Sequence, residues 1–431
     1  MKQYFDEYTA LLKRELIPAL GCTEPISVAY ASALSRDLLG AFPESMVVSC
    51  SPNVIKNARS VLVPMGGTLR GIEAAALMGA VGGEASLSME VLSAADEAAA
   101  QRVTELLKAG ICRLKRLETE EALAIRVEAF AAGRSSLVEI RGRHDRVVRA
   151  ERDGTAVDEP WQEGNRIRGW DDPPLSLGQI LEFAEKADLR LLEPVLSRQM
   201  ESNLRIAQEG LSGQWGARVG KTLLKHCGND VRTQAIAYAA AGSDARMSGC
   251  VLPVVINSGS GNQGLTASLP VIKYAEYYHV PREKLLRSLI VSNLVAIYQK
   301  RMLGTLSAFC GAVCAATGSG AGIAYMLDGR PDVIEKTIVN TLANVSGIVC
   351  DGAKPSCAAK IASSVHAAIL GFHMAQDQLA FQAGDGIVQK TADETCVAAM
   401  RIGRDGMRQT DRVVLDILLG QDSPGLPKAA V

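Results

Sequence analysis

The sequence contains few aromatic residues and almost no net charge. Phe, Trp and Tyr make up 4% of its 431 residues, which argues against a β-sandwich built on large rings and favours closely packed helices. The 46 basic residues nearly balance the 47 acidic ones, leaving a formal charge of −1. No net field draws such a chain to nucleic acid or to an anionic membrane, so a small-molecule partner is expected.

The start of the chain lacks the pattern of an export signal. MKQYFDEYTALLKREL carries charged residues throughout and has no uninterrupted apolar segment. The ten cysteines are therefore expected to be free thiols of a cytoplasmic protein. Two uncharged stretches, 247–272 and 302–327, are long enough to cross a bilayer. Gly-Ser clusters interrupt both stretches, so we expect buried helices with glycine-rich loops and no membrane.

Hydrophobic periodicity predicts an α+β protein in four parts. Residues 1–40 are expected to form two helices that pack on the C-terminal domain, and residues 41–155 a smaller α+β domain. The polar, proline-bearing stretch 156–174 is typical of a linker. A capping box at Ser176 and Gln179 then begins a mostly helical domain over 175–431. Within the smaller domain we expect strands at 47–48, 61–63, 112–117, 123–130 and 136–149, and helices at 72–81 and 94–109.

Two cysteines flank a tight loop in the last third of the chain. The apolar pattern predicts a helix from Pro331 to Cys350, and Asp-Gly and Lys-Pro pairs then force a turn. Ser356 is placed to cap the next helix, so Cys357 falls in its first turn, where the helix dipole favours a thiolate. With Cys310 as a third thiol, the set would hold a metal centre with one position free. The alternative is that all three are core cysteines. Cys314, four residues after Cys310, is a rival ligand.

Two further segments are candidates for catalysis or ligand binding. Cys22 stands just before a helix start with Pro25 in its first turn, a position that lowers a thiol pKa and suits a base or nucleophile; a buried turn cysteine is the alternative. The loop at 256–264 combines glycine freedom with Asn and Ser donors, so it suits a carboxylate or phosphate, unless it is only a helix break. The segment Asn53–Asn57 provides amide side chains and a lysine as further candidate ligand-binding groups.

Five ordered motifs, GCTEP, SPNVIKNA, INSGSGNQG, AFCGAVC and GIVCDGAKPSC, resemble the L-cysteine desulfidase family. That family is itself similar to the α-chain of the iron–sulfur L-serine dehydratases, which carry a Ser- and His-containing loop where this chain has GCTEP. The resemblance covers nearly the whole chain. It implies a [4Fe-4S] enzyme without pyridoxal phosphate that converts L-cysteine and water to pyruvate, ammonia and sulfide.

The resemblance also implies roles for individual residues, with the helical domain as the catalytic one. Cys22 would remove the α-proton, and Cys310, Cys350 and Cys357 would be the cluster ligands. The substrate-binding residues would be Thr23, Glu24, Asn57, Asn257, Ser258, Gly259, Ser260, Gly261 and Asn262. Serine is an alternative substrate, and a homo-oligomer is possible. Other readings of the same residues are a zinc hydrolase, a non-catalytic amino-acid-binding or membrane-associated helical protein, and a pyridoxal enzyme using Lys354.

Overall fold

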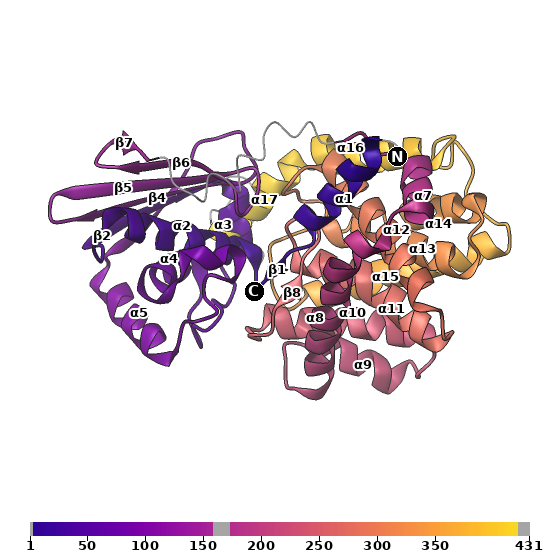
Figure 1. Ribbon diagram of the computed structural model, residues 1–431, viewed down its shortest axis with the longest axis horizontal. Coiled ribbons are helices and arrows are strands. Elements are labelled where there is room, and N and C mark those ends of the chain that lie inside the picture. The colour runs from indigo at the N-terminus through magenta and orange to yellow at the C-terminus, as the bar shows by residue number, and fades with distance from the viewer. Residues whose placement is uncertain (1–2, 158–172, 421–431) are drawn as a thin grey trace, which may run out of the picture.

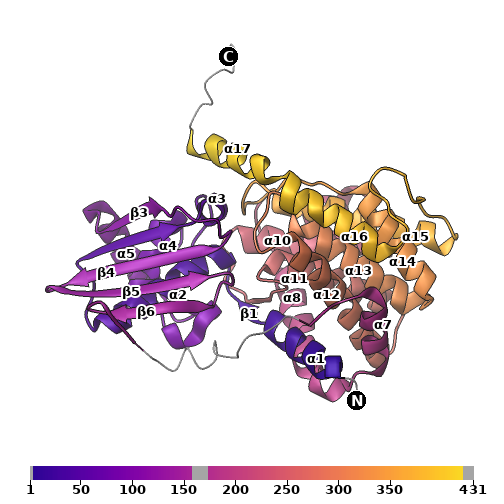
Figure 2. The same ribbon diagram turned by 90° about the horizontal axis from the view of Figure 1, so that it is seen from above.

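The computed structural model describes residues 3–157 and 173–420, so most of the expected linker lies outside the described residues. A six-stranded sheet with helices on one side stands beside a larger, mostly helical body (Figures 1 and 2). The predicted α+β class is confirmed.

The sheet of the smaller domain has the strand order β3-β2-β4-β5-β6-β7. Adjacent strands of this sheet run antiparallel, except β2 and β3, which are parallel. In β4, Ile125, Val127 and Ala129 are buried and alternate with more exposed residues, because helices cover only one face of this sheet. The elements of this domain are α2 (Thr23–Leu39), β2 (Ser45–Cys50), α3 (Pro52–Ala58), α4 (Gly71–Gly82), η1 (Ala85–Glu90), α5 (Glu97–Ala109), β3 (Cys112–Arg116), β4 (Ala124–Ala131), β5 (Arg134–Arg141), β6 (Val147–Arg152) and β7 (Thr155–Ala156).

Two of the expected strands differ from the structure. The segment 61–63 forms only an isolated bridge between Leu62 and Arg70. The segment 136–149 is not one strand but parts of β5 and β6, which are separated by a turn with Gly142 at φ +73°. A positive φ of this kind favours glycine and reverses the chain, a signal that the alternating pattern hid.

The two N-terminal helices belong to different bodies. Helix α1 (Gln3–Glu15) packs on the helical domain, where the Phe5 and Phe183 rings lie 5.2 Å apart and Tyr8 donates to the Pro174 carbonyl at 2.8 Å. Helix α2 instead contacts α4 and strands β4 and β5. Between them, β1 (Pro18–Ala19) pairs with β8 (Val254–Val255) of the helical domain. The expectation that both helices pack on the C-terminal domain is therefore wrong for α2, because its apolar residues cover the sheet.

The helical domain packs its helices closely through small residues. A Cβ on Gly318 would lie 2.3 Å from the Ser292 carbonyl oxygen of the neighbouring helix, so that approach requires glycine. Its elements are α7 (Leu177–Lys186), η2 (Leu189–Leu191), α8 (Glu193–Ser212), α9 (Val219–His226), α10 (Val231–Met247), β8, α11 (Gly261–Tyr277), α12 (Arg282–Leu303), α13 (Gly311–Leu327), α14 (Pro331–Asn344), α15 (Cys357–Gln376), α16 (Ala392–Arg401), η3 (Ile402–Gly406) and α17 (Arg408–Leu419). Among the described residues, none of these helices combines the length and apolar character needed to cross a membrane.

The helix expected to reach Cys350 ends earlier. Helix α14 stops at Asn344, and Val349 then forms a β-bridge with Phe309. The Ser-Gly pair at 346–347 favours this break, since Ser competes for backbone hydrogen bonds and Gly loses conformational entropy in a helix. The Cys350 segment thereby lies beside the segment that carries Cys310.

Candidate active site

The predicted residues meet where the two bodies adjoin. Cys22 is the N-cap of α2 and is 3% exposed. It packs with Val61 of the smaller domain and with Met247 at the end of α10. Cys357, the first residue of α15, packs against the same apolar cluster. The two bodies therefore bring the predicted base and one predicted cluster ligand into one neighbourhood.

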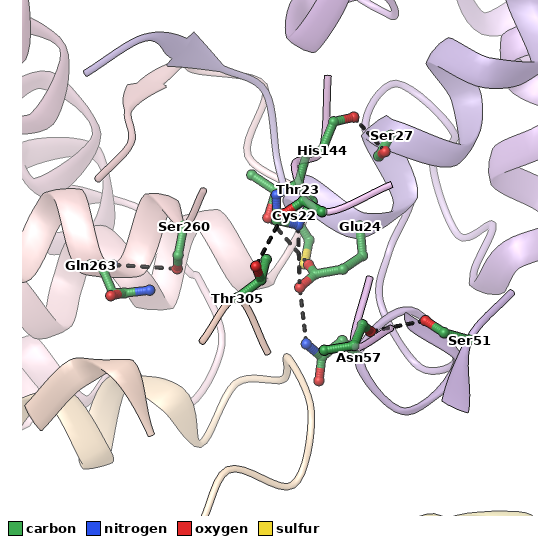
Figure 3. Close-up of polar contacts among 12 residues, drawn as sticks. Cys22, Thr23, Glu24, Ser27, Ser51, Asn57, His144, Ser260, Gln263 and Thr305 are labelled. Atoms are coloured by element: carbon green, nitrogen blue, oxygen red, sulfur yellow. Dashed lines mark hydrogen bonds and ion pairs between the residues drawn. The ribbon is translucent and has the colours of Figure 1, made fainter. Parts of the chain in front are cut away.

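Glu24 is the centre of the polar contacts beside Cys22 (Figure 3). Its Oε2 accepts from Cys22 Sγ at 3.1 Å and from Thr23 Oγ1 at 3.2 Å. Its Oε1 accepts from Asn57 Nδ2 at 2.9 Å and lies 3.7 Å from His144 Nε2. Burial works to raise the pKa of Glu24, but His144, Cys22 and Asn57 outweigh it and lower the pKa well below the usual range. Glu24 is therefore an ionised carboxylate buried at the domain junction.

The pKa of the Cys22 thiol shifts in the direction opposite to the one that the sequence predicts. Its place before a helix predicted a lowered pKa, whereas burial, with the neighbouring Glu24 carboxylate, raises the pKa well above its ordinary value. The charge of Arg246 opposes this effect without overcoming it. Desolvation and a like charge disfavour the thiolate more than one helix terminus favours it. Cys22 is accordingly a protonated donor to Glu24 in this structure.

His144 is a site residue that the sequence analysis missed. It lies in the turn between β5 and β6, within the charged run Arg-Gly-Arg-His-Asp-Arg, where nothing in the local pattern marks it. Its carbonyl accepts from Ser27 Oγ at 2.5 Å. From the helical body, Thr305 Oγ1 donates to the Gly142 carbonyl of the same turn at 3.0 Å. Both bodies therefore hold the His144 turn.

The predicted glycine loop begins with a tight turn. Ser258 and Gly259 have φ values of +49° and +76°, and Asn257 and Ser260 exchange two backbone hydrogen bonds across them. Asn257 donates its side-chain amide to Asn293 Oδ1 at 2.9 Å and accepts from Ser258 Oγ. Both ends of the Asn257 amide are thus engaged within the protein, where they support the turn.

The other end of the glycine loop begins α11. Ser260 caps this helix by accepting from the Gln263 backbone N–H. Asn262 Oδ1 accepts from Arg246 Nη1 at 3.1 Å, and a Cβ on Gly261 would lie 2.3 Å from Arg246 Nε. Among the described residues, Arg246 Nε and Gln263 Oε1 are buried without a hydrogen-bond partner. The loop thus presents an unsatisfied cationic donor beside a helix start, an arrangement suited to a carboxylate.

The three predicted ligand cysteines lie near one another. The Cys310 N–H donates to the Ile348 carbonyl at 2.9 Å, and the Cys350 N–H donates to the Ala308 carbonyl at 2.6 Å. The thiols of Cys310 and Cys350 hydrogen-bond, and Cys357 interacts electrostatically with both. Cys314 instead contacts Met400, with its sulfur 3.5 Å from the Met400 Sδ. The structure thus groups the first three thiols and places the rival Cys314 in the core.

Charge is distributed unevenly over these thiols. The hydrogen bond from Cys310 and the charge of Lys56 outweigh burial and lower the pKa of Cys350 to about 6. That same hydrogen bond, with burial, raises the pKa of Cys310. Burial also raises the pKa of Cys357, so the thiolate expected there from the helix dipole is not found. The buried side chain of Lys300 is a second cation in this region, and it interacts with Cys314 as well as with Cys350 and Cys310.

The donor set can be compared with the cofactor that the resemblance implies. Within 3–157 and 173–420, no group of three His, Cys, Asp or Glu side chains is arranged to hold a single metal ion. An iron–sulfur cluster is larger than one ion and takes thiolate ligands from separate segments. One thiol at the start of α13 and two that flank the loop before α15, with two buried lysines to offset thiolate charge, fit that chemistry.

A cavity of about 930 Å³ lies between the two bodies. His144, Ser258 and Gly259 line it together with Lys300 and Thr305, so it reaches both the turn beside Glu24 and the lysine near the thiols. It is large enough for a small ligand. Most of its charged lining is basic, contributed by Lys13, Arg14, Arg143, Arg146, Lys300 and Arg301 against Glu15 and Asp145.

Comparisons with known proteins cover most of the chain. Residues 86–416 match the family described as serine dehydratase alpha chain. The chain is 51% identical to a UPF0597 protein of Lachnoclostridium phytofermentans, over 95% of this chain and 98% of that protein. It is 45% identical to one from Desulfitobacterium hafniense, over 98% of each, and 37% identical to one from Bacteroides fragilis, over 95% and 96%.

Proposed function

Because the chain belongs to the serine dehydratase alpha-chain family, we propose that it is a lyase of the same kind that acts on L-cysteine, an L-cysteine desulfidase. One observation carries this proposal: Cys22 and the ionised Glu24 lie at the same domain junction as three grouped thiols. α,β-Elimination from an amino acid needs a positioned base and an electrophile for the leaving group. The junction offers residues for both.

Cys310, Cys350 and Cys357 would hold a [4Fe-4S] cluster through three thiolates. When bound, the cluster supplies a Lewis acid toward the substrate, since three protein ligands leave one iron open. Lys56 and Lys300 offset the negative charge of the thiolates in their buried surroundings. The ten free cysteines suit a reducing compartment, so a cytoplasmic location is part of the proposal.

The ammonium and carboxylate groups of an amino acid match the opposite charges of Glu24 and Arg246 at the domain junction. The Glu24 carboxylate, held by Thr23 and Asn57, would receive the substrate ammonium group. The glycine loop would receive the carboxylate through the backbone of Ser258 to Asn262 and through the unsatisfied Nε of Arg246. A zwitterion bound in this way would lie between the two bodies.

Cys22 would take the α-proton. The Glu24 charge contributes to the raised pKa of Cys22, so an ammonium group at Glu24 would offset that effect and favour the thiolate. The thiol proton would be released to water as the ammonium group binds, and the Cys22 thiolate would then take the α-proton. That proton would pass to the departing HS⁻, which leaves as H₂S, and Cys22 would be protonated again once the products are released. The aminoacrylate released would then rearrange and react with water to give pyruvate and ammonia.

Metal analysis of anaerobically purified protein tests the proposal. We expect iron and labile sulfide in the wild type, their loss in Cys310→Ala, Cys350→Ala and Cys357→Ala, and their retention in the matched control Cys314→Ala. Zinc in place of iron would favour a hydrolase, and saturable cysteine binding without pyruvate would favour a binding protein. Lys354 already pairs with Asp351; borohydride trapping of a cofactor on it would support pyridoxal chemistry instead.

L-Serine is the second candidate substrate, and the family match favours it. The comparison of kcat/KM for L-cysteine and L-serine decides between them, because that ratio measures differential transition-state binding. We expect the larger value for L-cysteine.

A further inference from the structure

We infer that His144 is a positioning residue that sets the selectivity of the site for an amino group, by orienting the Glu24 carboxylate toward the substrate ammonium. This inference rests on the proposed function, because it assigns to Glu24 the ammonium end of an amino-acid substrate.

The fold fixes where His144 lies. Ser27 of α2 holds its carbonyl, and Thr305 of the helical body holds the preceding Gly142 carbonyl. At the Nδ1 edge of the ring, a Cβ on Gly259 would lie 2.8 Å from Nδ1. The ring is thus confined between its own domain and the glycine loop of the other.

The Nε2 atom of His144 faces Glu24 at a distance longer than an ordinary hydrogen bond. His144 is 5% exposed, and its Nε2 is buried without a hydrogen-bond partner among the described residues. Nε2 lies 3.7 Å from Glu24 Oε1, so a shift of about 0.7 Å would give an ordinary hydrogen bond. A buried donor without a partner is costly, and a contact that tightens on ligand binding removes this cost.

His144 completes a set of donors around Glu24. Asn57 already donates to Oε1, while Thr23 and Cys22 donate to Oε2. These donors fix the rotation of the carboxylate, and His144 restrains it from the side of the cavity that it lines. Without His144, only these three donors restrain the carboxylate, and it turns more readily from the position that meets an incoming ammonium group. A ligand without an amino group does not use this contact.

Steady-state kinetics on the holoenzyme tests the inference with two variants. His144→Ala removes the donor, whereas His144→Gln replaces it with an amide near the position of Nε2. We expect KM for L-cysteine to rise about 10- to 100-fold in His144→Ala, the effect expected from loss of a hydrogen bond to a charged group, with a smaller change in kcat. His144→Gln should recover most of the affinity. The matched control His226→Ala, exposed at the end of α9, should behave as wild type.

Inhibition by 3-mercaptopropionate, which has the thiol and carboxylate of cysteine but no amino group, separates positioning from a structural effect. Its inhibition constant should be the same in wild type, His144→Ala and His144→Gln. An unchanged KM for L-cysteine in His144→Ala would overturn the inference, as would equal weakening of L-cysteine and the analogue. A wild type that neither binds nor converts L-cysteine would instead refute the proposed function.

Discussion

Lys56 and Asp411 form an ion pair across the domain junction, with 2.5 Å between Nζ and Oδ1. They are 355 positions apart in the sequence, and the pair joins α3 of the smaller domain to α17 (Figure 2). The second oxygen of Asp411 accepts from the Ala308 N–H at 3.0 Å, two residues before Cys310. One carboxylate therefore holds a cation near the thiols and the chain segment that carries one of them.

Substitution Asp411→Asn should destabilise the protein by about 3–5 kcal/mol, because it leaves the buried Lys56 ammonium without its counter-charge. Urea denaturation of the purified protein measures this difference. Asp416→Asn, on the same helix, is the matched control and should change the free energy of unfolding by less than about 0.5 kcal/mol. Equal midpoints for the two variants would contradict the role given to the ion pair.

Substitution Cys22→Ser should lower kcat about 100- to 10,000-fold, the usual contribution of a positioned general base. Iron content and thermal stability should stay close to wild type, since the change is nearly isosteric. Pyruvate and sulfide release report the activity. The exposed Cys227 provides the control, and Cys227→Ser should retain full activity. A Cys22→Ser enzyme with wild-type kcat would assign the base to another residue.

Substitution Gly259→Ala should destabilise the domain junction through two effects. Gly259 has φ +76°, and an added Cβ would lie 2.8 Å from His144 Nδ1. Gly133 has the same φ with no atom within 4 Å of the added Cβ, so Gly133→Ala carries only the backbone cost, on the order of 1 kcal/mol. Thermal denaturation should show a larger loss for Gly259→Ala, which should also raise KM for L-cysteine. Equal losses for both variants would show that His144 has room to move.

Substitution Asp244→Asn should stabilise the protein more at pH 8 than at pH 5. Burial raises the pKa of Asp244 from 3.8 to about 6, so the folded state holds this proton more tightly than the unfolded state. The group therefore makes folding less favourable above pH 6, and the loss is recovered as pH falls toward 4. Asparagine removes the titration. Melting temperatures at the two pH values measure the effect, and a difference independent of pH would rule out Asp244 as its source.

Local patterns predicted much of the fold. The helices near 72–81 and 94–109 correspond to α4 and α5, because their spacing of apolar residues reflects one buried face. Ser176 caps α7 with its side chain accepting from the Gln179 N–H, which is one half of the predicted capping box; the Gln179 side chain instead accepts from the hydroxyls of Ser176 and Tyr8. By contrast, the segment 136–149 was misread because alternation continues through the turn at Gly142 and does not show where a strand reverses.

The residues of the candidate site were likewise only partly predictable from the sequence. The sequence alone singled out Cys22, the glycine loop and the cysteines at 310, 350 and 357, since glycine and thiol groups mark close approach and soft-ligand chemistry wherever they occur. It did not indicate His144, Arg246 or Lys300, whose local surroundings resemble ordinary charged surface or helix. Their contacts with Glu24, the glycine loop and the thiols come from other segments of the chain.

The sequence by itself determined the chemical groups available to this protein and most of the elements that carry them. Only the tertiary structure decided their electrostatic state: it raised the pKa of Cys22 where the helix start predicted the opposite, and it buried Cys314 in the core against Met400. Side-chain type and helix position are local properties of the chain. Desolvation and charge–charge contacts depend on which distant segments meet, and those contacts are set when the two bodies pack together.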